Sequence, residues 1–224
     1  MSEPRVAAGR FRLIVFDWDG TLVDSTALIA SAIQHACRDV GEPVPEDVVA
    51  RHVIGLGLAD ALAHVAPGLP QERHPDLALR YRHHYLARDP EIPLFDGVRE
   101  MLDELDARGL LLAVATGKSR VGLDRALAQH GLAPRFIASR CADEGRPKPH
   151  PDMLLHLMDH VGVERHETLM IGDTTHDLEL AANAGAAAVA VAYGAHEFEG
   201  LARLRPLALL HSVAELRQWL RDYT

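Results

Sequence analysis

The sequence has only two cysteines and no long apolar run, which narrows the class of protein. Cys37 and Cys141 lie far apart and lack the spacing of metal ligands. We therefore expect two free thiols in a reducing compartment, with a single disulfide as the less favoured alternative. No segment is long enough to span a bilayer, and no apolar stretch of signal-peptide type follows Met1. These absences predict a cytoplasmic protein that does not bind a membrane.

Positive charge is also scarce. Lys and Arg number 23 against 32 Asp and Glu, so the formal net charge is -9 at pH 7. Because no dense Lys/Arg tract with aromatic neighbours occurs, we expect no nucleic-acid partner. Aromatic residues make up only 5% of the chain, and abundant Ala and Leu favour helical or α/β structure over an all-β fold. A chain of 224 residues can bury its own core, and both a monomer and a homodimer stay open.

Apolar runs of strand length alternate with helical patterns along most of the chain. The apolar runs predict strands at 13–16, 110–115, 136–138, 168–171 and 187–191. Helical spacing of apolar residues predicts helices at 25–40, 98–109, 120–129, 151–162, 178–185 and 213–220. Strands that alternate with helices imply a parallel sheet with right-handed crossovers. The sequence therefore predicts an α/β fold with a Rossmann-like parallel sheet and helices on both faces.

One long segment does not follow this alternation. From about residue 45 to 88 the pattern stays helical but is interrupted by Gly and Pro, and no strand-like alternation occurs. A helical block between the first strand and the next strand–helix unit is typical of an inserted subdomain. We therefore expect an all-helical insertion at residues 24–92, and a core built from residues 1–23 and 93–224.

Polar side chains follow three of the predicted strands. Asp17 and Asp19 come directly after the first strand, Thr116 ends the second, and Asp173 follows the strand at 168–171. Because the carboxyl ends of parallel strands share one edge of the sheet, we expect these side chains to meet there. Such an oxygen-rich cluster suits Mg²⁺, and beside the cation one carboxylate can act as a nucleophile while another transfers protons. The alternative is that Asp17 and Asp19 only cap a turn.

Four motifs in order along the chain resemble those of the haloacid dehalogenase superfamily, in its phosphoglycolate phosphatase-like branch with a helical cap. The resemblance covers nearly the whole chain, and its residues are Asp17-Trp18-Asp19-Gly20-Thr21, Thr116, Lys148 in Arg146-Pro147-Lys148-Pro149, and Gly172-Asp173-Thr174-Thr175-His176-Asp177. The resemblance implies that Asp17 attacks phosphorus to form an aspartyl-phosphate, while Asp19 transfers protons and offers its backbone carbonyl to the metal. It also implies that Asp173 binds Mg²⁺ directly and that Asp177 supports the metal through water or through Lys148.

The same resemblance gives Lys148 the task of neutralising the negative charge of the nucleophile and phosphate. Thr116 and the Gly117 N–H would bind the phosphoryl oxygens, and Gly55 and Gly57 resemble a substrate-facing loop of the cap. Simpler interpretations stay open for each: a solvated lysine, a helix N-cap at Thr116 and a helix-start turn at Gly55 and Gly57.

Two further residues have expectations of their own. Asp177 is alternatively an acid that stabilises the first turn of a helix. Lys118, two residues after Thr116, is expected on the surface.

These motifs predict a Mg²⁺-dependent phosphomonoester hydrolase that acts on a small phosphorylated metabolite, with phosphoglycolate as the nearest suggestion of the family. Asp19 favours cleavage of a C–O–P linkage over dehalogenation, because dehalogenating relatives lack this second acid. Phosphate transfer by a sugar phosphomutase of the same superfamily is the alternative reaction. A binding protein without catalytic activity on the same scaffold is a third possibility.

Overall fold

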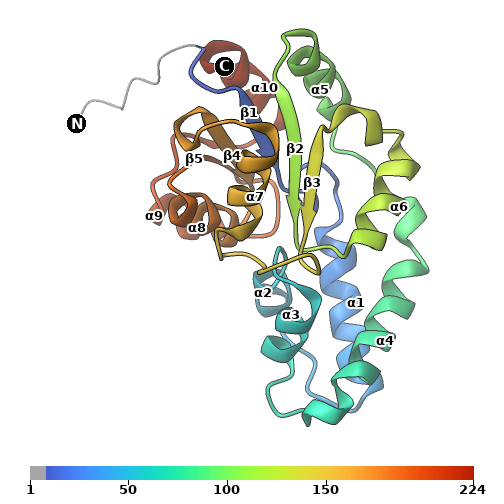
Figure 1. Ribbon diagram of the computed structural model, residues 1–224. Coiled ribbons are helices and arrows are strands. Elements are labelled where there is room, and N and C mark those ends of the chain that lie inside the picture. Colours follow the sequence, from blue (N-terminus) through green and yellow to red (C-terminus); the bar gives the residue numbers. More distant parts are fainter. Residues whose placement is uncertain (1–8) are drawn as a thin grey trace.

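The computed structural model describes residues 9–224. The strand that precedes Asp17 and Asp19 lies in the interior of its β-sheet. The sheet has six strands in the order β3-β2-β1-β4-β5-β6, and every pair of neighbours is parallel (Figure 1). The strands are β1 (Leu13–Phe16), β2 (Leu111–Thr116), β3 (Ala138–Cys141), β4 (Thr168–Gly172), β5 (Ala187–Val191) and β6 (Leu209–Leu210). The predicted α/β fold class is therefore confirmed.

Alternation along β1 divides its side chains between two apolar clusters. Ile14 and Phe16 pack into one cluster, whereas Leu13 and Val15 pack into the other. The first cluster includes apolar residues of α5 (Val98–Ala107), α6 (Arg120–His130) and α10 (Val213–Tyr223). The second includes those of α7 (Asp152–Val161) and α8 (Thr175–Ala184). Helices thus cover both faces of β1, as the continuous apolar run predicts.

Between β1 and α5 the regular elements are all helices. This helical segment contains α1 (Thr26–Asp39), α2 (Asp47–His52), α3 (Leu58–Val65) and α4 (His74–Leu86), with short 3₁₀ turns at Gln71–Arg73 and Asp89–Glu91. In Figure 1, α1 and α4 lie side by side and extend away from the sheet. The two ends of the segment meet, because the N–H of Asp24 donates to the carbonyl oxygen of Pro93 at 3.0 Å.

The third strand differs from its prediction. It occupies 138–141 and not 136–138, so the expected range was wrong at both ends. Residues Ala133–Arg135 form a 3₁₀ turn, and Ile137, which was expected in the strand, has 55% of its surface exposed. The apolar run therefore belongs to the approach to the strand, and β3 itself is more polar than a buried strand usually is.

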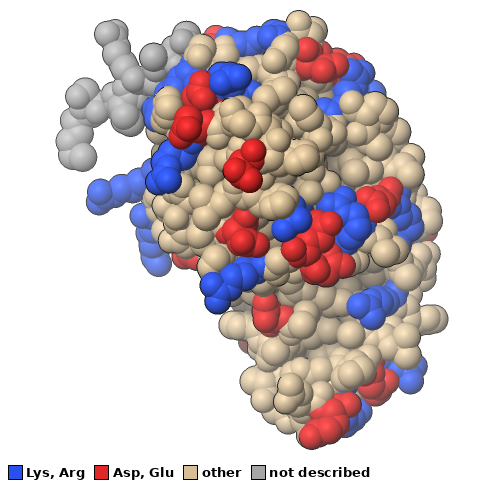
Figure 2. All heavy atoms as spheres, in the orientation of Figure 1, with Lys and Arg blue, Asp and Glu red and all other residues tan. Residues whose placement is uncertain are grey.

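Two elements near the end of the chain were not predicted. These are α9 (Phe198–Arg203) and the two-residue strand β6, both too short to show a clear periodicity in the sequence. The cysteines agree with expectation, since Cys37 and Cys141 are both buried and free. Among the described residues, no helix is long and apolar enough to cross a membrane. Figure 2 shows basic and acidic side chains intermixed on one face of the molecule.

Candidate active site

The carboxyl ends of three neighbouring strands carry side chains that converge at one edge of the sheet. Asp17 directly follows β1, Thr116 is the last residue of β2, and Asp173 directly follows β4. The backbone fixes Asp17 there, because its N–H donates to the carbonyl oxygen of Ile171 at 2.9 Å. All three polar side chains are buried. Parallel pairing therefore brings together residues that are distant in the sequence.

Lys148 lies between two carboxylates at this edge. Its Nζ donates to Oδ1 of Asp17 and to Oδ1 of Asp177, at 2.6 Å in each case. All three side chains are almost completely excluded from solvent. The alternative of a solvated loop lysine is therefore wrong. A single ammonium group is shared between two buried carboxylates.

The second oxygen of Asp177 caps helix α8. Its Oδ2 accepts hydrogen bonds from the backbone N–H of Thr174 at 3.1 Å and from the Thr174 hydroxyl at 2.7 Å. Thr174 is the N-cap residue of α8, and the pair forms a capping box. The sequence left open whether Asp177 stabilises the start of a helix or contacts Lys148. In the structure it does both, because one oxygen stabilises the start of α8 and the other contacts Lys148.

Asp173 is held by two donors on opposite sides. Its Oδ1 accepts from the hydroxyl of Thr21 at 2.7 Å, and its Oδ2 accepts from the N–H of Ala195 at 2.7 Å. Thr21 belongs to the loop after β1, and Ala195 follows β5. These contacts fix the orientation of the carboxylate before any ligand binds.

Burial and crowding of negative charge shift the pKa values of the cluster. Burial raises the pKa of Asp17 well above its ordinary value; Lys148 opposes this shift, and Asp177 and Asp173 add to it. Burial, together with the Asp177 carboxylate, raises the pKa of Asp173 to about 7. Burial alone would lower the pKa of Lys148, but Asp17 and Asp177 raise it above the ordinary value. The lysine is therefore charged at neutral pH.

The cluster has the donor set of a site for a hard divalent cation. Asp17, Asp173 and Asp177 each offer a carboxylate oxygen, and these atoms all lie within 4.8 Å of one another. Within residues 9–224, no hydrogen-bond donor reaches the buried Oδ2 of Asp17. Three carboxylates face one ammonium group, so the cluster has two more negative charges than positive charges when all are ionised. An oxygen-only donor set with excess negative charge fits Mg²⁺.

Asp19 lies apart from this acidic group. Its Oδ1 accepts a hydrogen bond from the hydroxyl of Ser25 at 2.7 Å and lies 3.1 Å from Nζ of Lys118. Its carboxylate is therefore engaged with neighbours other than Asp17, Asp173 and Asp177. The expectation that its backbone carbonyl binds a metal stays a prediction.

Lys118 is not on the surface as expected. Only 11% of its side chain is exposed, and its Nζ donates a 2.8 Å hydrogen bond to the hydroxyl of Tyr85 on α4. The one indication in the sequence that Lys118 lies near the site was its position two residues after Thr116, in the loop after β2. Its burial was not predictable from this position, because α4 of the helical segment supplies the cover.

Thr116 and Gly117 form the start of the loop after β2. The Oγ1 of Thr116 accepts the backbone N–H of Lys118 at 3.2 Å. The N-cap of α6 is Ser119, whose hydroxyl accepts from the N–H of Gly122, so the N-cap alternative for Thr116 is wrong. The binding of phosphoryl oxygens by Thr116 and Gly117 stays a prediction.

The loop Gly55-Leu56-Gly57 packs against the loops of the core. A Cβ on Gly117 would lie 2.5 Å from the carbonyl oxygen of Leu56 and 2.7 Å from that of Gly55, so only glycine fits there. Gly55 has a φ of +93°, which favours glycine, and Gly57 is the residue before α3. The helix-start interpretation of Gly57 is therefore met, and the loop also covers the carboxyl edge at Gly117.

Three histidines join the helical segment to the core near Asp177. The ring Nε2 atoms of His176 and His196 lie 2.9 and 3.0 Å from the carbonyl oxygen of His52. The rings of His52 and His196 stack with their centroids 4.9 Å apart. No pattern in the sequence indicates these contacts. Their contacts depend on how the helical segment docks.

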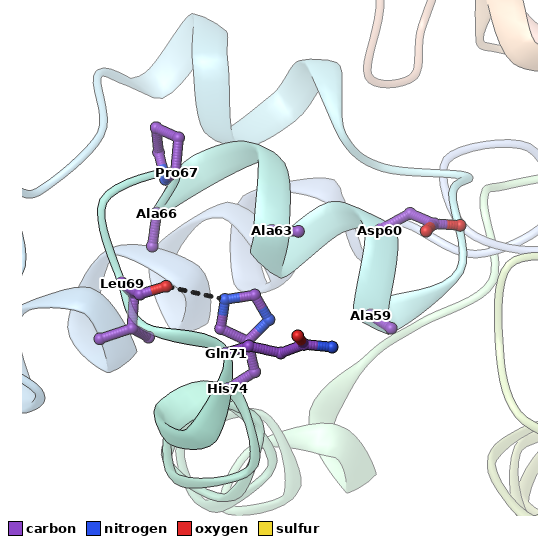
Figure 3. A pocket seen from close by; sticks show the side chains of 8 residues that line it. All are labelled: Ala59, Asp60, Ala63, Ala66, Pro67, Leu69, Gln71 and His74. Carbon is purple, nitrogen blue, oxygen red and sulfur yellow. Dashed lines mark hydrogen bonds between the residues drawn. The ribbon is translucent and has the colours of Figure 1, made fainter.

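Two other features belong to the helical segment. Arg51 donates to Asp47 at 2.6 Å and to Thr26 at 3.0 Å. A hollow of about 510 Å³ lies between α3 and the start of α4. Figure 3 shows its lining, with Asp60 at one end and the ring of His74 bonded to the Leu69 carbonyl at the other. None of the residues in its lining belongs to the acidic cluster.

The chain is similar to known proteins in both sequence and fold. A family model described as haloacid dehalogenase-like hydrolase matches residues 14–191. The "Probable phosphatase IndB" of Dickeya dadantii is 36% identical over 210 residues, which cover 91% of each chain. A phosphoglycolate phosphatase of Vibrio vulnificus is 32% identical over 214 residues, covering 92% of this chain and 94% of that one. The crystal structure of a predicted phosphoglycolate phosphatase from Haemophilus somnus has a TM-score of 0.82 and 27% identity, covering 93% of this chain and 97% of that one.

Proposed function

Since the chain belongs to the haloacid dehalogenase-like hydrolases and is a phosphatase of that type, we propose that it cleaves the phosphate ester of a small metabolite through a covalent intermediate on Asp17. The observation that carries this proposal is the state of the Asp17 carboxylate. One of its oxygens is bound to Lys148, and the other is buried and has no hydrogen-bond partner in the part of the chain that the structure describes. The second oxygen is therefore the one that can bind an electrophile or a cation without breaking a hydrogen bond of the folded protein.

Asp17, Asp173 and Asp177 would hold Mg²⁺, because their oxygens form the acidic group described above. When bound, the cation neutralises charge on the phosphoryl group and keeps the carboxylates ionised. Lys148 adds a second positive charge beside the nucleophile. Together they reduce the repulsion that otherwise opposes the attack of a carboxylate on a phosphate.

In the first step, a carboxylate oxygen of Asp17 forms a bond to phosphorus. The bond from phosphorus to the ester oxygen breaks, and its electron pair stays on that oxygen. Asp19 donates a proton to the same oxygen, so that a neutral alcohol leaves. The hydroxyl of Thr116 and the N–H of Gly117 are the groups at the end of β2 that would bind the phosphoryl oxygens.

In the second step, water attacks phosphorus and Asp19, now a carboxylate, accepts the proton of the water. The bond between phosphorus and Asp17 breaks, and its electron pair returns to the Asp17 carboxylate. Inorganic phosphate leaves, and both acids are restored to their starting states. The position of Asp19 two residues after the nucleophile, with its carboxylate outside the acidic group, supports this division of roles.

We further propose that residues 24–92 act as a cap over residues 1–23 and 93–224. In support, the regular elements of the segment are all helices, its ends meet at Asp24 and Pro93, and its loop at 55–57 lies against Gly117. Asp17 and Asp173 are both buried. Substrate entry therefore requires movement of the cap, and closure excludes bulk water from the covalent intermediate.

The substrate proposed first is phosphoglycolate, since relatives of this chain bear the name phosphoglycolate phosphatase. The test is a panel of small phosphate monoesters with purified protein and Mg²⁺, with release of inorganic phosphate as the measurement. We expect fast release for at least one ester, and none for Asp17→Asn, which is isosteric but a poor nucleophile. Rapid isomerisation of a sugar phosphate with slow phosphate release would instead support a mutase. Near-normal turnover by Asp17→Asn would refute the assigned nucleophile.

A further inference from the structure

Lys118 joins a catalytic carboxylate to the helical segment. Its Nζ lies 3.1 Å from Oδ1 of Asp19 on the core side and 2.8 Å from the hydroxyl of Tyr85 on the cap side. The ammonium group also lies 4.8 Å from the centre of the Tyr85 ring. A lysine so well buried needs partners, and within residues 9–224 these two groups are its partners.

Tyr85 contributes a neutral hydroxyl to this contact. Burial raises the pKa of its phenol above the ordinary value, and the charges of Asp19 and Asp89 add to the effect. The end of α4 is in turn fixed to the core, because Oδ2 of Asp89 accepts from Nε of Arg125 at 2.6 Å. Tyr85 is therefore presented to Lys118 only while α4 keeps its place against the core.

The two contacts that orient the Asp19 carboxylate are both made to its Oδ1 atom. Ser25 donates to it and Lys118 lies beside it, whereas no described residue donates to Oδ2. Oδ2 is thus the oxygen left to exchange a proton with the ester oxygen and later with water. The direction in which Oδ2 points depends on how firmly Oδ1 is held.

We propose that Lys118 is a positioning residue for Asp19, and that its hold depends on the hydroxyl of Tyr85. A free lysine side chain has many rotamers, so an ammonium anchored at a second point holds a carboxylate better than one anchored only at that carboxylate. The proton-transfer group is then correctly oriented only with the cap closed. This inference rests on the proposed function, in which Asp19 protonates the leaving oxygen.

The leaving group of the substrate gives a readout for this role. An alkyl alkoxide needs a proton as it leaves, whereas p-nitrophenolate leaves readily without one. Loss of Asp19 positioning should therefore slow the cleavage of an alkyl phosphate much more than that of p-nitrophenyl phosphate. A residue that only supports the fold, or only attracts phosphate, would affect both esters equally.

The experiment measures kcat and KM of the full-length enzyme with Mg²⁺ on two esters. These are p-nitrophenyl phosphate and the alkyl monophosphate of the panel that the wild-type enzyme hydrolyses fastest. For Lys118→Met we expect kcat/KM on the alkyl ester to fall about 10- to 100-fold, part of the usual contribution of general acid catalysis. On p-nitrophenyl phosphate we expect a loss of less than about threefold.

Tyr85→Phe tests the link to the cap and keeps the ring in place. Its kcat/KM should also fall more on the alkyl ester than on p-nitrophenyl phosphate. The fall should be smaller than in Lys118→Met, because only the hydrogen bond from Lys118 to Tyr85 is removed. Tyr81→Phe is the matched control: its ring stacks on that of Tyr85, yet the hydrogen bond of Lys118 goes to Tyr85. We expect Tyr81→Phe to match the wild type on both esters.

The double variant Lys118→Met/Tyr85→Phe completes the test. If Tyr85 acts through Lys118, the double variant should be no slower than Lys118→Met alone. Additive losses, equal losses on the two esters, or a rise in KM with unchanged kcat would each overturn the inference. If Lys118→Met does not fold, as judged by its thermal unfolding curve, the comparison of Tyr85→Phe with Tyr81→Phe still decides. A dead Asp17→Asn beside an unselective Lys118→Met would retain the proposed function and reject only this inference.

Discussion

The ammonium group of Lys148 lies 2.6 Å from Oδ1 of Asp17, and solvent reaches neither side chain. The same ammonium lies 2.6 Å from Oδ1 of Asp177. Lys148 is therefore a structural element as well as a proposed partner of the nucleophile, because it is the positive charge that compensates this buried carboxylate pair. Its removal should affect both stability and catalysis.

We predict that Lys148→Met lowers the free energy of unfolding by about 3 to 5 kcal/mol without Mg²⁺, the usual cost of breaking a buried ion pair on one side. Urea unfolding at pH 7 measures this change. Arg146→Met, an exposed cation of the same loop, should change stability by less than about 0.5 kcal/mol. Equal stability of Lys148→Met and the wild type would mean that the two carboxylates need no cation.

The sequence was enough to predict which residues meet at the carboxyl edge of the sheet, but not which hydrogen bonds and ion pairs their side chains form there. Asp17, Thr116 and Asp173 follow apolar runs that form neighbouring parallel strands, so their convergence could be predicted from topology alone. The complete burial of Lys148 could not, because a lysine between two prolines in a loop has no periodic pattern to indicate where its side chain points.

The contacts made by the helical segment were also beyond sequence reasoning. Lys118 was expected on the surface, yet Tyr85 of α4 covers it. His176 and His196 bond to the backbone of His52, which depends on the docking of a distant segment and not on local pattern. The predicted bounds of β3 were wrong for a different reason, because the apolar run in the sequence precedes the strand and the strand itself is polar.

The acidic group predicts a metal-dependent stability. Mg²⁺ should raise the Tm of the wild type by about 5 to 10 °C at a concentration about 100-fold above its Kd, because a ligand of the native state stabilises it by mass action. Asp173→Asn should lose most of this shift, since it removes one of the three carboxylates. Asp159→Asn, an exposed change on α7, should keep it. A full shift in Asp173→Asn would contradict the assigned site.

The close approach of the 55–57 loop to Gly117 predicts a penalty for a single methyl group. In Gly117→Ala the new Cβ would lie 2.5 Å from the Leu56 carbonyl oxygen, so the loop must move away. We expect kcat/KM to fall about 10- to 100-fold, as a displacement of about 1 Å near an active site commonly causes.

Gly122→Ala in helix α6 is the control for this substitution. Its Cβ would lie 3.3 Å from the Ser119 hydroxyl and 3.9 Å from Cβ of Lys118, and alanine favours a helix by up to about 1 kcal/mol over glycine. Activity should be unchanged and stability equal or higher. Wild-type kcat/KM in Gly117→Ala would show that the loop does not need this contact during turnover.

Glu104 links α5 to the last helix and makes stability depend on pH. It forms ion pairs with Arg217 and with Arg221, the latter at 2.6 Å, and hydrogen bonds from Arg217 and Arg221 lower the pKa of Glu104 to about 2. The unfolded chain has the ordinary value of about 4.3 for glutamate. The unfolded state therefore binds more protons between these two values, so the contribution of Glu104 is complete above about pH 4.3 and is lost as pH falls toward 2.

We predict that Glu104→Gln is less stable than the wild type at pH 7 and that the difference shrinks as pH falls from about 4.5 to 3, because the wild type then loses its advantage. Urea unfolding at pH 7, 4.5 and 3 measures this difference. Glu199→Gln is the control, since Glu199 is exposed and forms no ion pair with residues 9–224. It should show a difference from the wild type that is small and independent of pH. A difference for Glu104→Gln that stays constant over this range would mean that the two arginines stabilise α10 by packing and not by charge.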